Sequence, residues 1–396
     1  MRYKKIKLGD ISKVSSSKRI FAKQYVDFGI PFYRQKEIID KKNKAEISDP
    51  LFISQETYDE IKKRFGVPQK GDLLITAVGV TLGIPYVVDD EIFYFKDGNL
   101  IWLREFDNEI DSNYIYYWIL SDVGQKSMWA RTIGSAQPAL TIDTIKQFEI
   151  PVPSYNAQVK IVSILKAYDD LIENNQKQIK LLEEAAQRLY KEWFVDLRFP
   201  GYEDVAVVDG VPEGWQERTL SEIADVVMGQ SPKSEFYNRN QDGLPFHQGV
   251  GSYGTRFVVD ETYSTSLTRI AEANSVLFSV RAPVGRLNIT KNKIVIGRGL
   301  AAINQKDGYQ SYLFYLLKER FFKDDVVGNG SIFASISKDE LLRQRFTFPA
   351  KDLIVRFNNL VAQLDKKIAA LDSQTELLKQ ARDRLLPRLM NGELEV

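Results

Sequence analysis

An uninterrupted helical pattern in the middle of the chain most constrains its fold. Between Asn156 and Phe194, apolar residues recur at alternating steps of four and three, with neither Pro nor Gly between them. This seam of period 3.5 is typical of helices that pack lengthwise on another helix. A helix of about 38 residues is roughly 57 Å long. The predicted seam residues are Ile161, Leu165, Tyr168, Ile172, Ile179, Leu182 and Leu189.

The same register returns 196 residues later, between Lys351 and Met390. Thr375 and Arg382 are the weak positions of this second seam. A narrow apolar seam stays exposed unless another helix covers it, so we expect the two helices to pack on each other. The seam residues of the second helix are Phe357, Val361, Leu364, Ile368, Leu371, Leu378 and Leu385.

The segments that precede the two helices also repeat. Residues 30–35 are predicted to form a strand that residues 244–248 repeat, and residues 275–279 repeat residues 72–76. Short apolar strands with helices inserted between them indicate an α+β domain in each half. We predict five segments, namely domain 1 (1–153), a central helix (154–197), a linker (198–212), domain 2 (213–349) and a C-terminal helix (350–396).

Connection length predicts the direction of the two helices. If they ran parallel, the chain would have to travel back about 57 Å before the second helix began. Antiparallel packing needs only the short linker. We therefore predict an α+β fold of two repeated globular domains separated by two long antiparallel coiled-coil helices, with pseudo-two-fold symmetry.

Composition excludes several classes of function. The 54 Lys and Arg residues balance 53 Asp and Glu residues, so net charge alone does not indicate nucleic-acid binding. Cys is absent and His247 is the only His, which excludes thiolate sites and the common His-based metal sites. The N-terminus lacks the apolar core of a signal peptide, and no apolar run is long enough to span a membrane. We expect a cytoplasmic protein with no metal site and no membrane contact.

No catalytic motif stands up to inspection. Residues 15–18 and 335–338 match Ser-x-x-Lys but lack the motifs that accompany it in β-lactamase-like enzymes. Glu60 and Lys62 faintly resemble a nuclease site, but they lie on an ordinary amphipathic helix with no counterpart in the second half. A nuclease would lose cleavage on Glu60→Ala or Lys62→Ala. We predict no catalytic residue and no cofactor bound by this chain.

Polar loops lie at matching places in the two halves. Hydroxyls and cations suit phosphate contacts, Gln can pair with adenine and Arg can read guanine. A turn or an ordinary surface is the alternative interpretation for each loop. The candidate DNA-binding residues are Lys18, Arg19, Arg34, Gln35, Ser135 and Gln137 in the first half, and Gln230, Ser231, Lys233, His247, Gln248, Arg281, Arg286, Arg298 and Ser331 in the second.

With these features in order, the chain resembles the specificity (S) subunit of type I restriction-modification systems over nearly its whole length. The most telling stretches are residues 137–153 leading into 158–162, residues 171–175, residues 212–215 and the early loop at 229–232. Each fragment alone is modest. Their order, their duplication and their alternation with long helices make the combination specific.

The resemblance implies two target-recognition domains, each reading one half of a bipartite, asymmetric site in double-stranded DNA. It also implies that the helices set the spacing and bind two methyltransferase subunits, and that endonuclease/translocase subunits join for restriction. S-adenosylmethionine, ATP and Mg are then expected in the partner subunits. Ile354 departs from the repeat by replacing the residue that matches Gln158. A duplicated coiled-coil scaffold that joins partners without reading DNA is the alternative.

Overall fold

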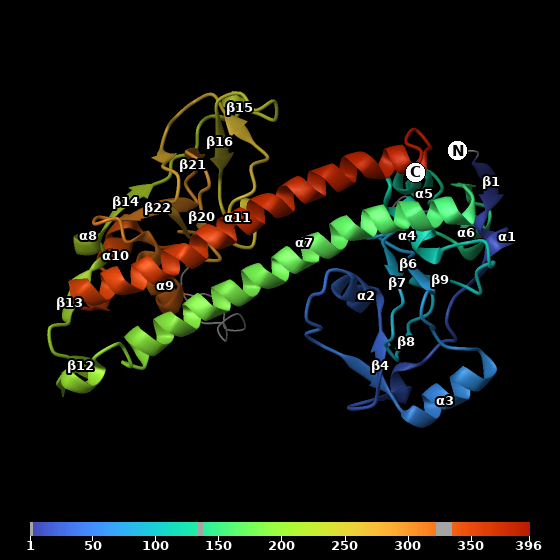
Figure 1. Cartoon of the computed structure of the whole chain (residues 1–396), viewed down its shortest axis with the longest axis horizontal. Helices are drawn as coiled ribbons and strands as arrows, with labels where there is room; N and C mark the ends of the chain where they lie inside the picture. Colours follow the sequence, from blue (N-terminus) through green and yellow to red (C-terminus); the bar gives the residue numbers. More distant parts are fainter. Residues whose placement is uncertain (1–2, 134–137, 322–334) are drawn as a thin grey trace. The chain divides into compact units, whose positions relative to one another are not determined.

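The computed structural model describes residues 3–133, 138–321 and 335–396. The chain forms two compact units. Unit 1 comprises Met1–Asn174 and Gln374–Val396, and unit 2 comprises Asn175–Ser373. Each unit therefore holds one globular domain together with part of both long helices (Figure 1). The five predicted segments divide the chain by sequence and remain a prediction.

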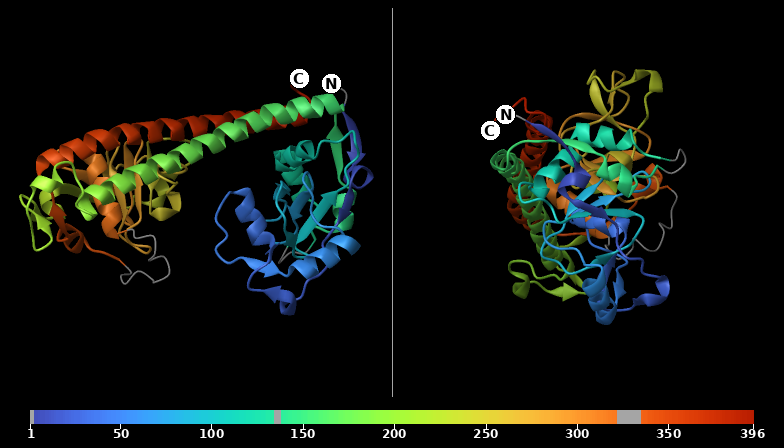
Figure 2. Two further views of the ribbon diagram at one scale, coloured as in Figure 1. Left: turned by 60° about the horizontal axis from the view of Figure 1, so that its bottom comes forward. Right: turned by 90° about the vertical axis from the view of Figure 1, so that its right-hand side faces the viewer.

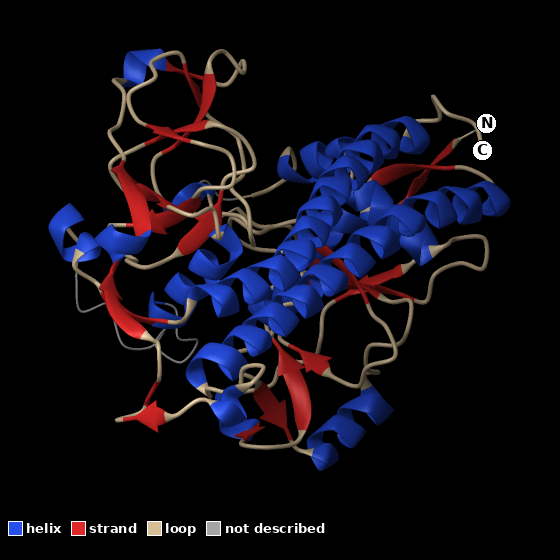
Figure 3. Ribbon diagram, turned by 60° about the vertical axis from the view of Figure 1, so that its left-hand side comes forward, coloured by secondary structure: helices blue, strands red, loops and turns tan. Residues whose placement is uncertain are grey.

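Unit 1 alternates short strands and helices before α7 begins at Tyr155. Figure 3 distinguishes the helices of the chain (blue) from its strands (red). Its strands are β1 (Lys4–Lys7), β2 (Lys13–Ser15), β3 (Tyr25–Val26), β4 (Ile30–Tyr33), β5 (Leu51–Ile53), β6 (Leu73–Thr76), β7 (Pro85–Val87), β8 (Tyr94–Phe95), β9 (Leu100–Arg104) and β10 (Glu149–Val152). Its short helices are α1 (Leu8–Ile11), α2 (Gln35–Lys42), α3 (Gln55–Arg64), α4 (Ser112–Leu120), α5 (Asp122–Trp129) and α6 (Ile142–Lys146), with a 3-10 turn at Ala22–Gln24.

Unit 2 follows the same pattern. Its strands are β11 (Val207–Val208), β12 (Val211–Pro212), β13 (Gln216–Thr219), β14 (Ala224–Met228), β15 (Tyr237–Asn238), β16 (Leu244–His247), β17 (Tyr263–Ser264), β18 (Ile270–Ala271), β19 (Val276–Ser279), β20 (Leu287–Ile289), β21 (Ile294–Ile296), β22 (Leu300–Gln305) and β23 (Arg345–Phe348). Its short helices are α8 (Leu220–Ile223), α9 (Gln310–Phe321) and α10 (Lys338–Leu342), with 3-10 turns at Tyr202–Asp204, Ser234–Phe236 and Val250–Ser252.

Sheet topology confirms the repeat. The strand orders β2-β9-β6-β7 and β3-β5-β4-β8 in unit 1 correspond to β14-β22-β19-β20 and β15-β17-β16-β21 in unit 2. Each unit also closes with an antiparallel pair, β1 with β10 and β13 with β23. The parallel pairing of β4 with β8 also recurs, as β16 with β21. Unit 2 has the additional edge strand β18, so the two units share their sheet framework but differ at one sheet edge.

The two long helices are α7 (Tyr155–Tyr190), which ends in a π-helical turn at Lys191–Val195, and α11 (Lys351–Met390). In unit 1 the start of α7 packs on the end of α11, through residues such as Leu165 and Leu389. In unit 2 the end of α7 packs on the start of α11, through residues such as Ala186 and Phe357. This exchange of ends confirms antiparallel packing, and the paired segments lie side by side in Figure 2.

Burial along both helices follows the predicted register. Ile161, Leu165, Phe357, Val361 and Ile368 are buried. Several leucines outside the seam are exposed, namely Leu171, Leu181, Leu360 and Leu377. Burial of the seam is the main apolar stabilisation available to helices of this length. Half-buried seam positions are Tyr168, Leu182, Leu189, Leu364, Leu378 and Leu385, and Ile172, Ile179 and Leu371 are buried.

The position at which the repeat departs, Gln158 against Ile354, lies inside the fold. Gln158 is buried, its Oε1 accepts a hydrogen bond from the Asp111 backbone N–H at 3.0 Å, and its Nε2 donates to the Glu109 and Pro153 carbonyls. Ile354 is also buried and belongs to the apolar core of unit 2. The substitution therefore exchanges a polar brace for an apolar contact.

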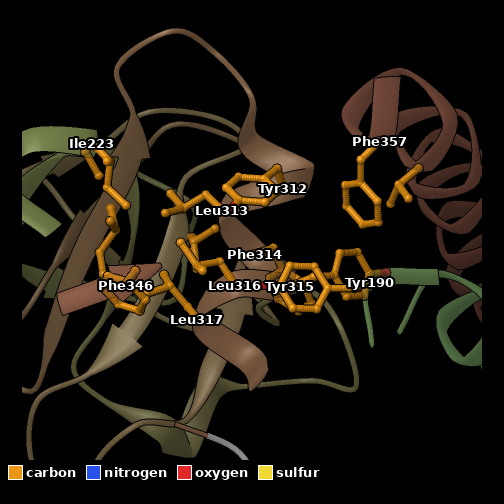
Figure 4. Packing of buried hydrophobic residues seen from close by; sticks show 14 of the residues in the cluster. Tyr190, Ile223, Tyr312, Leu313, Phe314, Tyr315, Leu316, Leu317, Phe346 and Phe357 are labelled. Atoms are coloured by element: carbon orange, nitrogen blue, oxygen red, sulfur yellow. The ribbon is translucent and has the colours of Figure 1, made fainter. Parts of the chain in front are cut away.

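An aromatic cluster forms the centre of unit 2. The rings of Tyr190 and Phe357 have centroids 5.7 Å apart, and those of Tyr312 and Phe357 have centroids 6.2 Å apart (Figure 4). Tilted and edge-to-face geometries of this kind stabilise aromatic pairs beyond their buried area. Because Tyr190, Phe357 and Tyr312 belong to α7, α11 and α9, the cluster fixes domain 2 on both long helices.

One local prediction was wrong, and one predicted segment contains additional structure. Residues 30–35 were expected to form one strand, but β4 ends at Tyr33 and α2 begins at Gln35. The Glu37 side chain accepts a hydrogen bond from the Arg34 backbone N–H at 2.7 Å, so it caps a helix that follows the strand directly. The segment expected to be a plain linker contains the two-stranded hairpin β11–β12, closed by Asp209 and Gly210 at positive φ.

Candidate nucleic-acid interface

One loop is held in the same way in both domains. In domain 1 the Thr76 hydroxyl donates to the Thr81 carbonyl at 2.5 Å and accepts from the Ile84 N–H at 2.8 Å. In domain 2 the Ser279 hydroxyl donates to the Pro283 carbonyl at 2.6 Å and accepts from the Arg286 N–H at 2.8 Å. A hydroxyl at the end of β6 or β19 thus closes the following loop, and that loop carries different side chains in the two domains.

In domain 1 this loop is braced by Gln35. The Gln35 Nε2 donates to the Val78 carbonyl and to the Thr81 hydroxyl, both at 2.8 Å. A groove beside it is lined by Lys36, Ile39, Asp40 and Asn99 in addition to these residues. Gln35 was predicted to contact DNA, but its amide donors are used inside the loop. In this structure it is a positioning residue of the loop.

The early loop of domain 1 meets the same region. The Ser16 hydroxyl donates to the Leu100 carbonyl at 2.9 Å, and the Lys18 N–H donates to the Tyr94 hydroxyl at 2.7 Å. Arg19 forms an ion pair with Asp97 at 2.7 Å. Lys18 and Arg19 are exposed, and the Lys18 Nζ lies 5.3 Å from the centroid of the Phe65 ring.

Arg34 is engaged within the domain. Its Nη2 lies 2.5 Å from Glu37 Oε1 and 3.7 Å from Asp49 Oδ2. Burial acts to raise the pKa of Glu37, but the hydrogen bonds from Arg34 outweigh it and hold that pKa below its ordinary value. A DNA contact by Arg34 would have to compete with this buried carboxylate. Arg34 therefore supports the β4–α2 connection, and its contact with DNA stays a prediction.

The corresponding region of domain 2 converges on Ser231. Its hydroxyl donates to Gln248 Oε1 at 2.8 Å and accepts from the Arg298 N–H at 3.2 Å. Gln248 and Arg298 are exposed. Arg281 and Arg286 flank the loop that Ser279 closes, so three arginines come from two neighbouring loops of one domain.

The prediction that His247 contacts DNA is not supported. Its ring is buried, with Nδ1 2.8 Å from the Ser252 hydroxyl and Nε2 2.9 Å from Asp260 Oδ1. Both ring nitrogens therefore have partners within the domain. His247 fixes the backbone beneath Gln248 instead of facing solvent.

The remaining candidates are placed as follows. Lys233, Gln230 and Arg281 are exposed, and Arg286 is half-buried. The candidates Ser135, Gln137 and Ser331 lie outside the described residues. The candidate residues did not include Val80, whose side chain is 91% exposed at the tip of the domain 1 loop. The sequence feature that could have identified Val80 is the apolar run of residues 78–80. This run follows the end of a buried strand and precedes the turn at Gly83.

A buried arginine ties domain 2 to both long helices. The Arg256 Nη2 lies 2.6 Å from Asp365 Oδ1 on α11, and its Nη1 lies 3.6 Å from Glu183 Oε1 on α7. Its guanidinium carbon is also 3.8 Å from the centroid of the Phe314 ring. Burial raises the pKa of Glu183, although Arg256 acts to lower it.

Domain 1 uses the opposite arrangement, with the arginine on the helix. Asp169 of α7 accepts from the Tyr117 hydroxyl at 2.6 Å and from Arg382 of α11 at 2.7 Å. This ion pair explains why the second seam tolerates an arginine. Burial, and then the nearby Arg382, lower the pKa of Lys42 at the end of α2 to about 8.

Within the described residues, no group of three His, Asp or Glu side chains is arranged to hold a metal ion. Across that same part of the chain, no helix combines the length and apolarity needed to cross a membrane.

Two repeated α+β domains, each presenting fixed loops with different polar side chains, define a duplicated recognition protein. The sequence matches the family described as "Type I restriction modification DNA specificity domain" over residues 2–184 and 212–382. The chain belongs to this family.

The relatives agree with this assignment. The chain is 29% identical over 301 residues to the type I restriction enzyme MjaIX specificity subunit of Methanocaldococcus jannaschii, covering 72% of this chain and 69% of the relative. It is 23% identical over 470 residues to the HindI specificity subunit of Haemophilus influenzae, covering 99% of each. The crystal structure of a type I system S subunit from M. genitalium is 16% identical and shares the fold, with a TM-score of 0.62 over 98% of this chain and 96% of that one.

Membership of this family makes the chain a DNA specificity subunit of a type I restriction-modification system, a non-catalytic component. The alternative of a scaffold that never reads DNA finds no support among these relatives.

Proposed function

We propose that each domain reads one half of a bipartite, asymmetric site in double-stranded DNA. One observation carries this proposal: the same loop framework, closed by Thr76 in domain 1 and Ser279 in domain 2, presents different side chains in the two domains. A shared framework with dissimilar loops suits two related but different ligands. Base edges in the major groove are distinguished by such donor and acceptor patterns.

The long helices set the distance between the half-sites and hold two methyltransferase subunits, which endonuclease/translocase subunits join for restriction. Support comes from the anchoring of each domain on both helices, through Arg256 in one case and through Asp169 in the other. Because each domain is fixed on both helices, the length of the helix pair determines the distance between the loops of the two domains. S-adenosylmethionine, ATP and Mg act in the partner subunits, and this chain binds no cofactor. The complex works in the cytoplasm, where chromosomal DNA is available.

A domain exchange tests the assignment of one half-site to each domain. Residues 1–153 are replaced by those of a relative with another specificity, and the chimera is co-expressed with the methyltransferase of the wild-type system. Mapping of methylated adenines is expected to reveal one changed half-site and one retained half-site. Retention of both half-sites, or a change in both, contradicts the proposal. Exchange of residues 213–349 is the reciprocal control.

A further inference from the structure

A single hydroxyl in domain 2 links two exposed residues whose side chains suit base recognition. Ser231 donates to Gln248 Oε1 and accepts from the Arg298 backbone N–H. The segment that carries Ser231 is fixed as well. The Gln230 N–H donates to the Ile296 carbonyl at 2.9 Å, and the Thr268 hydroxyl donates to the Gln230 carbonyl at 2.5 Å. Ser231 therefore lies on a braced backbone.

Two glycines bring the Arg298 turn against the backbone of Gln248. A Cβ on Gly297 would lie 2.6 Å from Gln248 Oε1, and a Cβ on Gly299 would lie 2.5 Å from the Gln248 carbonyl oxygen. Only glycine fits such an approach without movement of the neighbour. The Gly299 N–H also donates to the Gln248 carbonyl at 3.2 Å. Gln248 and Arg298 therefore leave the surface from adjacent points of a close-packed backbone.

Directly below, the buried His247 ring is held by Ser252 and Asp260. The exposed side chains of Gln248 and Arg298 are thus attached to a backbone that is held by buried contacts. A binding site requires such support if its side chains are to keep their geometry. Because the Ser231 hydroxyl holds the Gln248 Oε1, the orientation of the Gln248 amide group, and with it the direction of Nε2, is also fixed. That oxygen keeps a second lone pair after accepting from Ser231.

We propose that Gln248 and Arg298 are the direct base-reading pair of domain 2 and that Ser231 is their positioning residue. The half-site of domain 2 then contains a guanine, read by Arg298 through its O6 and N7 atoms, beside an adenine, read by Gln248 through its N6 and N7 atoms. This inference rests on the proposed function, because it assumes that domain 2 reads DNA.

Domain 1 has a similar contact between a serine hydroxyl and a backbone N–H, but it lacks the exposed Gln and Arg side chains there. The Ser16 hydroxyl accepts from the Gly98 N–H at 3.4 Å, so in domain 1 the corresponding backbone contact comes from a glycine instead of an arginine. Arg34, which the strand pairing matches to Gln248, forms an ion pair with the buried Glu37, and the next residue, Gln35, donates to Val78 and Thr81. The reading pair is therefore specific to domain 2, and the half-site of domain 1 depends on other groups.

The test uses the full chain co-expressed with its methyltransferase, followed by methylation assays on duplexes with single base changes. Exchange of residues 213–349 first identifies the half-site that belongs to domain 2. Arg298→Ala is expected to lower the preference for guanine at one position by about 5- to 150-fold, the range of 1–3 kcal/mol for a bidentate contact. Preferences in the half-site of domain 1 stay unchanged and provide an internal control.

Gln248→Glu is expected to move the preference at the neighbouring position from adenine toward cytosine, because a carboxylate accepts from the cytosine N4 amino group. Ser231→Ala weakens both preferences, and Ser231→Thr restores them. Arg345→Ala, which removes an exposed arginine paired with Glu217, changes neither position.

A wild-type half-site of domain 2 without guanine overturns the inference, as does an Arg298→Ala protein that keeps full discrimination there. In both of these outcomes a bipartite methylated motif is still found. Absence of any bipartite motif in the wild type instead contradicts the proposed function.

Discussion

The Arg256 Nη2 atom lies 2.6 Å from Asp365 Oδ1, and the Arg256 side chain is only 2% exposed. Glu183 completes the site from α7, and Phe314 covers the guanidinium face. One residue thus joins domain 2 to both long helices. Removing one partner of a buried ion pair is costly because the other charges stay in a poorly solvated place.

We therefore expect Arg256→Ala to destabilise unit 2 by about 3 kcal/mol. The measurement is urea unfolding followed by circular dichroism, with the midpoint compared with that of the wild type. Arg345→Ala is the matched control, because its pair with Glu217 is 67% and 58% exposed and is worth less than about 1 kcal/mol. Equal shifts for the two variants would rule out the anchoring role.

Lys42 gives unit 1 a pH dependence of defined sign. Its pKa in the folded chain, about 8, lies below its ordinary value of 10.5. Between these values the unfolded state binds more protons than the folded state, so the contribution of Lys42 to stability increases as pH rises from about 8 toward 10.5. Lys42→Met is expected to remove this rise in thermal unfolding curves. The exposed Lys62→Met is the control, and an unchanged slope in Lys42→Met refutes the prediction.

Close packing at Gly229 predicts a strong effect of one methyl group. A Cβ there would lie 2.1 Å from the Gly297 carbonyl oxygen, whereas a Cβ on Gly249 meets nothing within 4 Å. Gly229→Ala is expected to cost about 1–3 kcal/mol through forced displacement of the loops. Gly249→Ala should leave the unfolding midpoint near the wild-type value. Differential scanning fluorimetry of both variants measures their unfolding midpoints. The midpoint of Gly249→Ala must be higher than that of Gly229→Ala, and equal midpoints contradict the prediction.

Much of the fold follows from local pattern, while much of the site does not. The seam from Ile161 to Leu189 has a period that belongs to one kind of packing, so the helices and their pairing are predictable. The parallel pairing of β4 with β8 joins Phe32 to Tyr94 across a long stretch of chain, and no local signal encodes it.

The roles of the polar residues show the same division. Arg34 and Gln248 occupy matching places after β4 and β16, yet Arg34 pairs with the buried Glu37 and Gln248 is exposed. His247 is polar and lies beside Gln248, but Ser252 and Asp260 reach it only after the chain turns back. Burial and partners of this kind depend on tertiary structure. Residue type and spacing therefore point to loops, but they do not distinguish exposed side chains from side chains that support the fold.

Helix length is expected to control the unread spacer between the half-sites. Inserting one heptad in both α7 and α11 preserves the seam and adds about 10.5 Å. At about 3.4 Å per base pair, the spacer in the methylated motif should lengthen by about three base pairs. A seven-residue insertion at the β11–β12 turn is the control and should leave the spacer as it is. Identical spacers in all three proteins would exclude the helices as the measure of distance.

The most direct test of a two-domain DNA-reading subunit is a map of methylated adenines in cells that co-express this chain and its methyltransferase. Single-molecule sequencing of the host genome provides that map. The expected result is one motif with two defined half-sites and an unread spacer, present only when this chain is expressed. Methylation at a continuous motif, or methylation that does not depend on this chain, would contradict the account.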